Sequence, residues 1–279
     1  MSEADELGAL ASLAVKGDGA ALSTLCRRLE TPVYRLCLRM LGDPSDAEDA
    51  AQDVLVKVVT NLGSFEGRSA LSTWVHQIAV RHVLAVKKSR AEERSLDEEA
   101  FAALLERGLA FGARLPPTTP EDRALAIEVR LSCTQGMLLM LSREDRLMLV
   151  LVDFLGFAAG EAAELAGVSH DAMRQRLSRA RSRLGTFLQA KCGEVNAATA
   201  CRCERQVAGK RAQGLTGSRL PFSALATGDL GMREDASLAM AELEALRRVA
   251  RVFQAGGEWR APATLRERMQ RLLPTVLCS

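Results

Sequence analysis

Apolar residues recur every three to four positions along most of the chain, which is the period of an amphipathic α-helix. Alternating apolar and polar positions of the kind that make strands are not clustered in the sequence. The pattern predicts helices over residues 7–15, 20–41, 46–62, 70–90, 121–141, 160–166 and 170–184, and further along over 235–253 and 262–273. We therefore expect an all-α protein, in which segments such as Gly42-Asp43-Pro44 end one helix and start the next.

The segment 142–184 has the pattern of a helix-turn-helix. Its apolar run 147–155 is expected in the core, and a short helix over 160–166 follows. Gly167 supplies a tight turn, and Ser169 is a natural N-cap, because its hydroxyl can accept from free backbone N–H groups of the next turn. The helix after it has a buried stripe at helical spacing, formed by Ala172, Met173, Leu177, Ala180 and Leu184.

Arginines occupy the outward face of this second helix. A helix in a DNA major groove uses its first turns for base edges and its flanks for phosphates. Base contacts are therefore expected from Asp171, Ala172, Arg174 and Gln175, and phosphate contacts from Arg179, Arg181 and Arg183. The alternative is a solvated arginine face on an ordinary helix.

Composition and charge indicate the number of domains and the cellular compartment. The 279 residues are 48% apolar and 4% aromatic, with a net charge of +2, and suggest two domains with a small third. Positive charge is concentrated in 81–94, 174–191 and 202–219, as in nucleic-acid-binding proteins. The sequence has no apolar run long enough for a membrane span and no signal peptide, so we expect a cytoplasmic protein without a disulfide framework.

The helix predicted over 46–62 has an acidic face. Glu48 and Asp49 are explained by the helix dipole, which favours anions in the first turn, but Asp53 extends the acidic face beyond it. An acidic surface on a chain with basic elements suggests a basic protein partner.

A polar loop and a basic helix follow this acidic helix. The loop 63–69 carries one exposed aromatic residue, Phe65, and the helix 70–90 ends in basic residues, an arrangement that suits single-stranded or melted nucleic acid. His76 and His82 are expected to be polar surface residues rather than ligands, because neither has a partner at metal-ligand spacing.

The order of these features resembles a known family. The stretch VYRLCLRMLGDPSDAEDAAQDVLVKV followed by LSTWVHQIA resembles region 2 of extracytoplasmic-function (ECF) sigma factors of bacterial RNA polymerase. The stretch LMLVLVDFLGFAAGEAAELAGVSHDAMRQRLSRARSRL resembles their region 4. The resemblance implies region 2 over 1–92, a linker over 93–120, region 4 over 121–190 and a small helical C-terminal extension over 191–279. An acidic run at 92–99 lies across the start of this linker, which contains three prolines between 116 and 120.

The resemblance also implies partners and roles. The partners would be core RNA polymerase, through its β′ clamp helices and β flap, and promoter DNA, and no membrane, enzymatic activity or required cofactor is expected. The linker would thread toward the polymerase active-site channel. The residues implied in binding the polymerase are Asp46, Glu48, Asp49, Gln52 and Asp53. Those implied at the −10 element are Phe65, Arg68, Ser69, Trp74, Arg81, Lys87 and Lys88. Those implied at the −35 element are Ser169, Asp171, Ala172, Arg174, Gln175, Arg176, Arg179 and Arg181.

This sequence departs from the family pattern at two positions. Arg81 stands where the family usually has Asn, and Ala85 where it often has Asp. An additional positive charge at position 81 should not weaken binding of a DNA strand.

The C-terminal extension holds a cluster of cysteines. Cys192, Cys201 and Cys203 lie within twelve residues, and Cys278 could be a fourth ligand if the tail folds back. Soft thiolates suit Cu(I) or Zn(II), whereas the alternative is unliganded thiols in a loop. The layout resembles ECF sigma factors with cysteine-rich extensions, including the CorE-like group. Regulation by an anti-sigma factor or by the extension itself stays open.

Two other functions compete with a sigma factor. A stand-alone helix-turn-helix regulator would not need the acidic helix or the loop and basic helix of residues 63–90. A cysteine- or metal-dependent enzyme would need a His or carboxylate near the cysteines, where only Glu194 and Glu204 are present.

Overall fold

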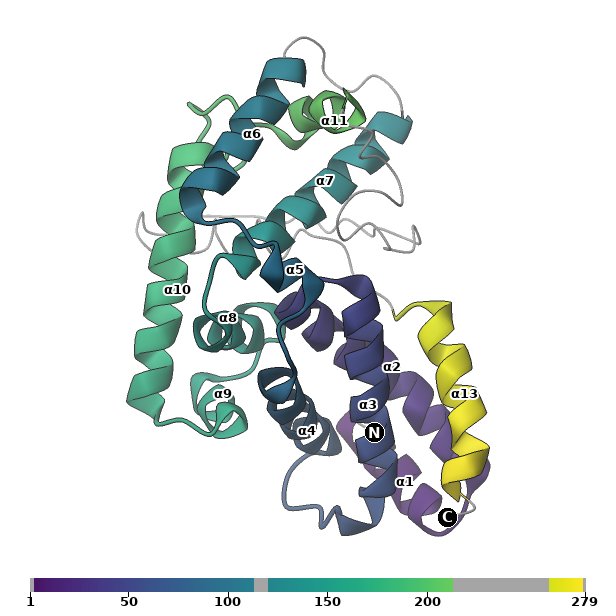
Figure 1. Cartoon of the computed structure of the whole chain (residues 1–279). Helices are drawn as coiled ribbons and strands as arrows, with labels where there is room; N and C mark the ends of the chain where they lie inside the picture. Colours follow the sequence, from purple (N-terminus) through teal and green to yellow (C-terminus); the bar gives the residue numbers. More distant parts are fainter. Residues whose placement is uncertain (1–2, 113–119, 213–260, 278–279) are drawn as a thin grey trace.

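The computed structural model describes residues 3–112, 120–212 and 261–277 (Figure 1). Within these ranges the regular structure consists of helices, without strands, which confirms the all-α prediction. The elements are α1 (Glu3–Val15), α2 (Gly19–Leu41), α3 (Pro44–Thr60), the short η1 (Leu62–Ser64), α4 (Leu71–Ala85), α5 (Arg90–Glu93), α6 (Glu98–Gly112), α7 (Pro120–Leu139), α8 (Arg143–Leu149), the π-helical η2 (Val150–Phe154), α9 (Ala159–Ala166), α10 (His170–Lys191), α11 (Cys203–Ala212) and α13 (Ala263–Leu277).

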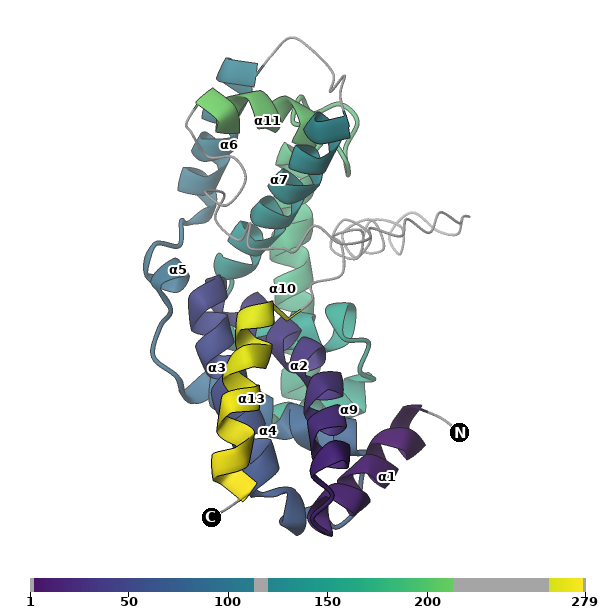
Figure 2. The same cartoon turned by 90° about the vertical axis from the view of Figure 1, so that its right-hand side faces the viewer.

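Helices α1 to α4 form one end of the molecule, with α13 lying against α2 and α3 (Figures 1 and 2). Helices α6, α7 and α11 form the other end, and α10 runs along one side between the two ends (Figure 1). In the part of the chain that is described, no helix is long and apolar enough to cross a membrane.

The helix-turn-helix has the predicted turn and cap. Gly167 lies in the left-handed region with φ 65°, where a residue without Cβ is favoured. The Ser169 hydroxyl accepts a hydrogen bond from the backbone N–H of Ala172 at 3.2 Å and caps α10. Met173, Leu177, Ala180 and Leu184 are buried, which confirms most of the predicted stripe.

The apolar run before the turn is only partly in the core. Leu147 to Leu151 are buried, whereas Val152 to Leu155 are half-buried. The helix widens into the π-turn η2 within this run, which changes the direction of its side chains.

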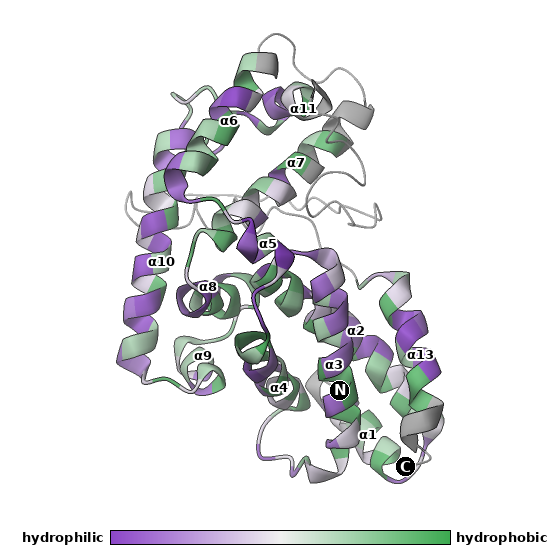
Figure 3. Ribbon diagram, in the orientation of Figure 1, coloured by the Kyte–Doolittle hydropathy of each residue, from purple (hydrophilic) through white to green (hydrophobic). Residues whose placement is uncertain are grey.

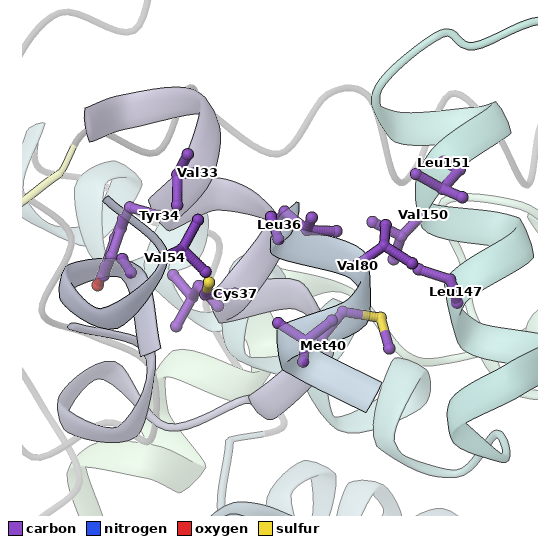
Figure 4. Packing of buried hydrophobic residues seen from close by; sticks show 14 of the residues in the cluster. Val33, Tyr34, Leu36, Cys37, Met40, Val54, Val80, Leu147, Val150 and Leu151 are labelled. Carbon is purple, nitrogen blue, oxygen red and sulfur yellow. The ribbon is translucent and has the colours of Figure 1, made fainter. Parts of the chain in front are cut away.

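One hydrophobic cluster crosses both predicted domains. Figure 4 shows Leu36 of α2 and Val80 of α4 on one side and Leu147, Val150 and Leu151 on the other. At the α4–α9 contact, the rings of His76 and Phe157 lie edge to face with centroids 5.0 Å apart. The two predicted domains are therefore packed together in this conformation.

A buried ionic cluster fixes the junction between them, and we call Glu92, Arg143 and Arg146 the interdomain joint. The Glu92 carboxylate accepts from Arg143 at 2.8 and 2.5 Å and from Arg146 at 3.0 Å. Arg146 also donates to the carbonyl oxygens of Met40, Leu138 and Leu141, so all three of its guanidinium nitrogens have partners although the residue is only 3% exposed.

The joint explains why α4 is shorter than predicted. The pattern predicts a helix to residue 90, but α4 ends at Ala85 and Val86 is extended. Arg143 donates to the Val86 carbonyl at 2.6 Å and to the Lys87 carbonyl at 2.9 Å. These carbonyls therefore bind a guanidinium in place of further helical N–H groups.

The predicted linker contains a full helix that packs on the extension. Helix α6 contacts α11, and the Gln206 amide donates to the Leu105 carbonyl at 2.8 Å. Gly108 and Gly209 allow the close crossing, because a Cβ on Gly209 would lie 2.3 Å from the Gly108 carbonyl oxygen. The predicted threading of this segment into the polymerase stays a prediction, and here α6 is held by α11.

Two predictions about the C-terminal extension have different outcomes. The helix predicted over 262–273 is present as α13. The helix predicted over 235–253 lies outside the described residues, as does Cys278.

Candidate nucleic-acid and protein interfaces

The acidic face of α3 is positioned by a strong helix start. Asp43 is the N-cap and accepts from the Asp46 N–H at 3.0 Å, with Pro44 in the first turn. Asp46 accepts from the backbone N–H of Arg90 at 2.9 Å, which ties α3 to α5. Gln52 is partly buried and Asp53 is exposed.

Helix α13 covers two carboxylates of this face. The Thr264 hydroxyl donates to Glu48 at 2.7 Å, and Arg268 donates to Asp49 at 2.7 Å. Periodicity predicted the helix but gave no sign of its partner, because 216 residues separate Thr264 from Glu48. The arginines of α13 could have indicated α3 as the partner, because their charge is opposite to that of the acidic face.

The loop between α3 and α4 holds the first predicted −10 residues. Phe65 is half-buried, since its ring lies 5.5 Å from that of Trp74, so the prediction of a freely exposed Phe65 is wrong. Arg68 and Ser69 are exposed at the loop, and Arg68 is paired with the neighbouring Glu66.

A concavity of about 390 Å³ opens beside this loop, between α3 and α4. Its lining includes Trp74, Ile78 and Arg81 from α4 and Lys57 from α3. Of the remaining basic candidates, Arg81, Lys87 and Lys88 are all exposed. The loop and the concavity therefore combine two half-buried aromatic rings, Phe65 and Trp74, with exposed cations.

Both histidines of α4 are buried, so their predicted surface positions are wrong. His82 Nδ1 accepts from the Lys57 ammonium at 2.7 Å, and His76 Nδ1 donates to the Ser72 carbonyl at the same distance. Burial lowers the pKa of His82, the Lys57 charge lowers it further and Asp53 opposes the change. His82 is then neutral at pH 7, and its imidazole nitrogen accepts from the Lys57 ammonium.

The first turns of α10 present the predicted base-contacting residues to solvent. Ser169, Asp171, Arg174 and Gln175 are exposed, whereas Ala172 and Arg176 are half-buried. Figure 3 shows α10 with predominantly hydrophilic colouring along its length. No described residue forms an ion pair with Arg174, so its guanidinium is available to a ligand.

The later arginines of α10 already have carboxylate partners. Arg179 pairs with Asp145 at 3.0 Å, Arg181 with Asp153 at 2.5 Å, and Arg183 with Glu98 at 3.7 Å. Hydrogen bonds from Arg181 to Asp153 raise the pKa of Arg181 despite the opposing effect of its burial. Phosphate contacts by these residues would require exchange of an existing partner.

The cysteines of the extension share a pocket but do not form a ligand set. Cys133, Cys192, Cys201 and Cys203 line a cavity of about 540 Å³. Burial raises the pKa of Cys201 and, against the opposing effect of Arg130, raises that of Cys203 to about 12, so both are thiols rather than thiolates at pH 7. Across the described residues there is no group of three or more His, Cys, Asp or Glu side chains placed to hold a metal. The predicted site at Cys192, Cys201 and Cys203 therefore does not fit Cu or Zn in this conformation.

Comparison with protein families finds two matching segments in the chain. Residues 25–92 match the family Sigma-70 region 2, and residues 131–184 match Sigma-70, region 4. Both matches end before α11 and α13. The chain is therefore similar to sigma factors of the sigma-70 type in two regions that follow one another in this order.

The curated relatives to which the chain is similar include ECF sigma factors. The chain is 28% identical over 175 residues to the ECF RNA polymerase sigma factor SigM of Mycobacterium tuberculosis, an alignment that covers 62% of this chain and 80% of SigM. It is 26% identical over 171 residues to the ECF RNA polymerase sigma factor SigW of Bacillus subtilis, covering 61% and 89% of the two chains. A solved structure of CnrH in complex with the cytosolic domain of CnrY is 24% identical with a TM-score of 0.47, over 67% of this chain and 99% of that one. The two regional matches and the two sequence relatives agree in their similarity to ECF sigma factors.

Proposed function

We propose that this protein binds core RNA polymerase and directs it to promoters through separate −10 and −35 contacts. The observation that carries the proposal is the presence of a region 2 match and a region 4 match in one chain. A stand-alone regulator needs the second but not the first. The protein then acts as an initiation factor and needs no catalytic residues of its own.

The acidic face of α3 is the proposed polymerase contact, formed by Asp46, Glu48, Asp49, Gln52 and Asp53. Complementary charge increases association rates and excludes wrong partners, so an acidic face suits a basic surface on the β′ clamp helices. Region 4 would contact the β flap.

The concavity between α3 and α4 is the proposed site for an unstacked base of the −10 element. Its volume of about 390 Å³ is within the range for small ligands. Trp74 supplies an aromatic ring for stacking, while Arg81, Lys87 and Lys88 supply charge for the backbone of the strand. Phe65, Arg68 and Ser69 would border the same strand.

The N-terminal half of α10 is the proposed −35 contact. Exposed Arg174 and Gln175 have donors suited to guanine and adenine edges in the major groove. Ser169, Asp171 and Ala172 lie in the same turns, with Arg176, Arg179 and Arg181 at the flanks for phosphates.

Simultaneous contact with both elements requires the two regions to separate. Elements named for positions −35 and −10 lie roughly 25 base pairs apart, or about 85 Å of duplex at about 3.4 Å per pair. In this structure α4 and α9 are in direct contact. We infer that it is the conformation of the free protein.

Run-off transcription with core polymerase tests the proposal, with Arg174→Ala and Arg183→Ala as paired variants. Arg174→Ala should cost about 1–3 kcal/mol of −35 binding and relax base preference. Arg183→Ala should leave base preference unchanged. It should reduce the slope of log binding constant against log salt concentration by roughly one unit, the amount expected for one lost phosphate contact.

The contrary result is equally clear. Sequence-specific DNA binding without any association with core polymerase would favour the stand-alone helix-turn-helix regulator. An unchanged promoter profile for Arg174→Ala would remove that residue from base recognition.

The proposed function includes no metal step, because the described cysteines do not form a ligand set. Regulation by copper or zinc stays a prediction for a rearranged extension, and elemental analysis of the protein beside a Cys201→Ser/Cys203→Ser variant checks it. An external anti-sigma factor also stays a prediction.

A further inference from the structure

Helix α13 lies lengthwise against region 2, beside α3 and α2 (Figures 1 and 2). Leu265, Met269 and Leu273 repeat every four residues and are 0%, 2% and 8% exposed. All three belong to the same hydrophobic cluster as the core of α2 and α3. The contact is therefore a packed helix interface, with a regular apolar stripe at its centre.

Polar contacts border this stripe and engage acidic residues. Thr264 and Arg268 bind Glu48 and Asp49 on α3, as described above. Arg266 donates to Glu30 of α2 at 3.1 Å, and Glu30 is only 2% exposed. A basic helix is thus matched in charge as well as shape to the acidic side of region 2.

We infer that α13 is a built-in competitor of core polymerase for the acidic face of α3. The inference rests on the proposed function, which assigns Glu48 and Asp49 to polymerase binding. The same carboxylates cannot accept from Thr264 and Arg268 while a basic polymerase surface contacts them. Binding of the polymerase to α3 then requires α13 to dissociate from region 2. Until it does, α13 contributes the positive charge that would otherwise come from the polymerase surface.

The competitor is part of the same chain, which determines how it acts. A tethered segment is present at a fixed effective concentration, so its occupancy does not fall when the protein is diluted. The apparent affinity for polymerase is reduced by the fraction of molecules in which α13 is displaced. The polymerase can displace α13, because the ion pair between Arg268 and Asp49 is partly exposed. Such exposed pairs contribute little to the free energy of docking.

Equilibrium binding of the full chain to core polymerase tests this inference, with three variants compared to the wild type. Arg268→Glu places a negative charge opposite Asp49, and Leu265→Asp/Met269→Asp disrupts the apolar stripe. Arg271→Glu is the matched control, because Arg271 is 77% exposed and its described partner is Glu267 of the same helix.

Both α13-releasing changes should increase affinity for core polymerase, within the range of about 5- to 150-fold that is typical of coupled sites. Arg271→Glu should bind like the wild type. Melting temperatures of all variants identify any that fail to fold, and Arg268→Glu, a surface change, tests the idea even if the double variant does not fold.

Three outcomes separate the competing explanations. Equal affinities for the wild type and both releasing variants would overturn the competition while leaving the proposed function intact. An equal gain in Arg271→Glu would show a general charge effect and would also overturn it. Failure of every form, including the released variants, to bind core polymerase would overturn the proposed function and the competition together.

Discussion

The interdomain joint and the α13 interface both connect parts of the chain that are distant in sequence, but they are built in opposite ways. The joint buries charge: Glu92 lies between two guanidinium groups that also use backbone carbonyls. The α13 interface buries an apolar stripe and leaves its ion pair with Asp49 partly exposed. A buried ionic network holds its groups in a single arrangement. A helix that docks through an apolar stripe and an exposed ion pair can dissociate from its site and bind there again.

Physical chemistry accounts for the difference. A buried charge that loses its partner is strongly destabilising, so the three groups of the joint must separate together or not at all. At the α13 border, the Arg268–Asp49 pair is close to water, which replaces a lost partner at small cost, whereas Glu30 opposite Arg266 is buried. Under the competition inferred above, displacement of α13 is the easier step, and opening of the joint is the more difficult one.

The largest expected effect comes from removing the anion of the joint. Glu92→Gln should destabilise the protein by about 3 kcal/mol, because it leaves Arg146 buried without a counter-charge. Burial alone would raise the pKa of Glu92, but hydrogen bonds from Arg143 and the Ser89 backbone, with the charges of both arginines, lower it to about 2. This pKa is below the ordinary value of 4.5, so Glu92 stabilises the fold above about pH 4.5, and the contribution is lost as the pH falls toward 2.

Urea unfolding as a function of pH measures both parts of this prediction. The variant should be less stable at pH 7 and should lose less stability than the wild type on acidification. The control is Glu106→Gln, which removes an exposed partner of Lys191 and should change neither quantity measurably. If the free energy of unfolding changes with pH in the same way in the wild type and in Glu92→Gln, the stability of the joint does not depend on this carboxylate.

An intermediate effect is expected at the centre of the α13 stripe. Leu265→Ala removes a fully buried side chain, a change that typically costs about 2–5 kcal/mol. The loss should fall on docking of α13 rather than on the whole fold. Amide hydrogen exchange should therefore show faster exchange in α13 with little change in α10.

Leu13→Ala serves as the comparison, since Leu13 of α1 is 47% exposed and should have no such effect. If Leu265→Ala accelerates exchange equally in α10 and α13, the helix is an integral part of the fold and cannot leave separately.

The smallest effect is expected at the border of the interface. Arg268→Ala should reduce stability by less than about 1 kcal/mol, and salt should diminish the difference. Arg266→Ala should cost more, because it leaves the carboxylate of Glu30 buried without its described partner. Thermal unfolding at low and high salt ranks the two variants, and the reverse order would mean that Glu30 is solvated when α13 is in place.

Local chemistry allowed part of this structure to be predicted from sequence. The turn at Gly167 and the cap at Ser169 follow from backbone conformation and one hydroxyl, and both are present. The acidic face of α3 and the existence of α13 as a helix also follow from spacing alone. In each case the residues that determine the feature lie within a few positions of one another.

Long-range pairing was the part that could not be predicted. Glu92 belongs to an acidic run that has the composition of a linker, and nothing near it indicates Arg143 and Arg146 as partners. His82 is polar and sits beside basic residues, yet α3 buries it through Lys57. The spacing of the cysteines suggested ligands, but it carries no information about the burial that keeps Cys203 protonated.

Because α13 lies near the C-terminal end of the sequence, it is synthesised long after α3. About 200 residues separate the end of α3 from the start of α13, which at 5–20 residues per second corresponds to roughly 10–40 s of synthesis. During that interval the nascent chain presents its acidic helix without the segment that covers it. The competitor inferred here therefore acts on finished molecules, and a ribosome stalled before α13 would display region 2 in its uncovered form.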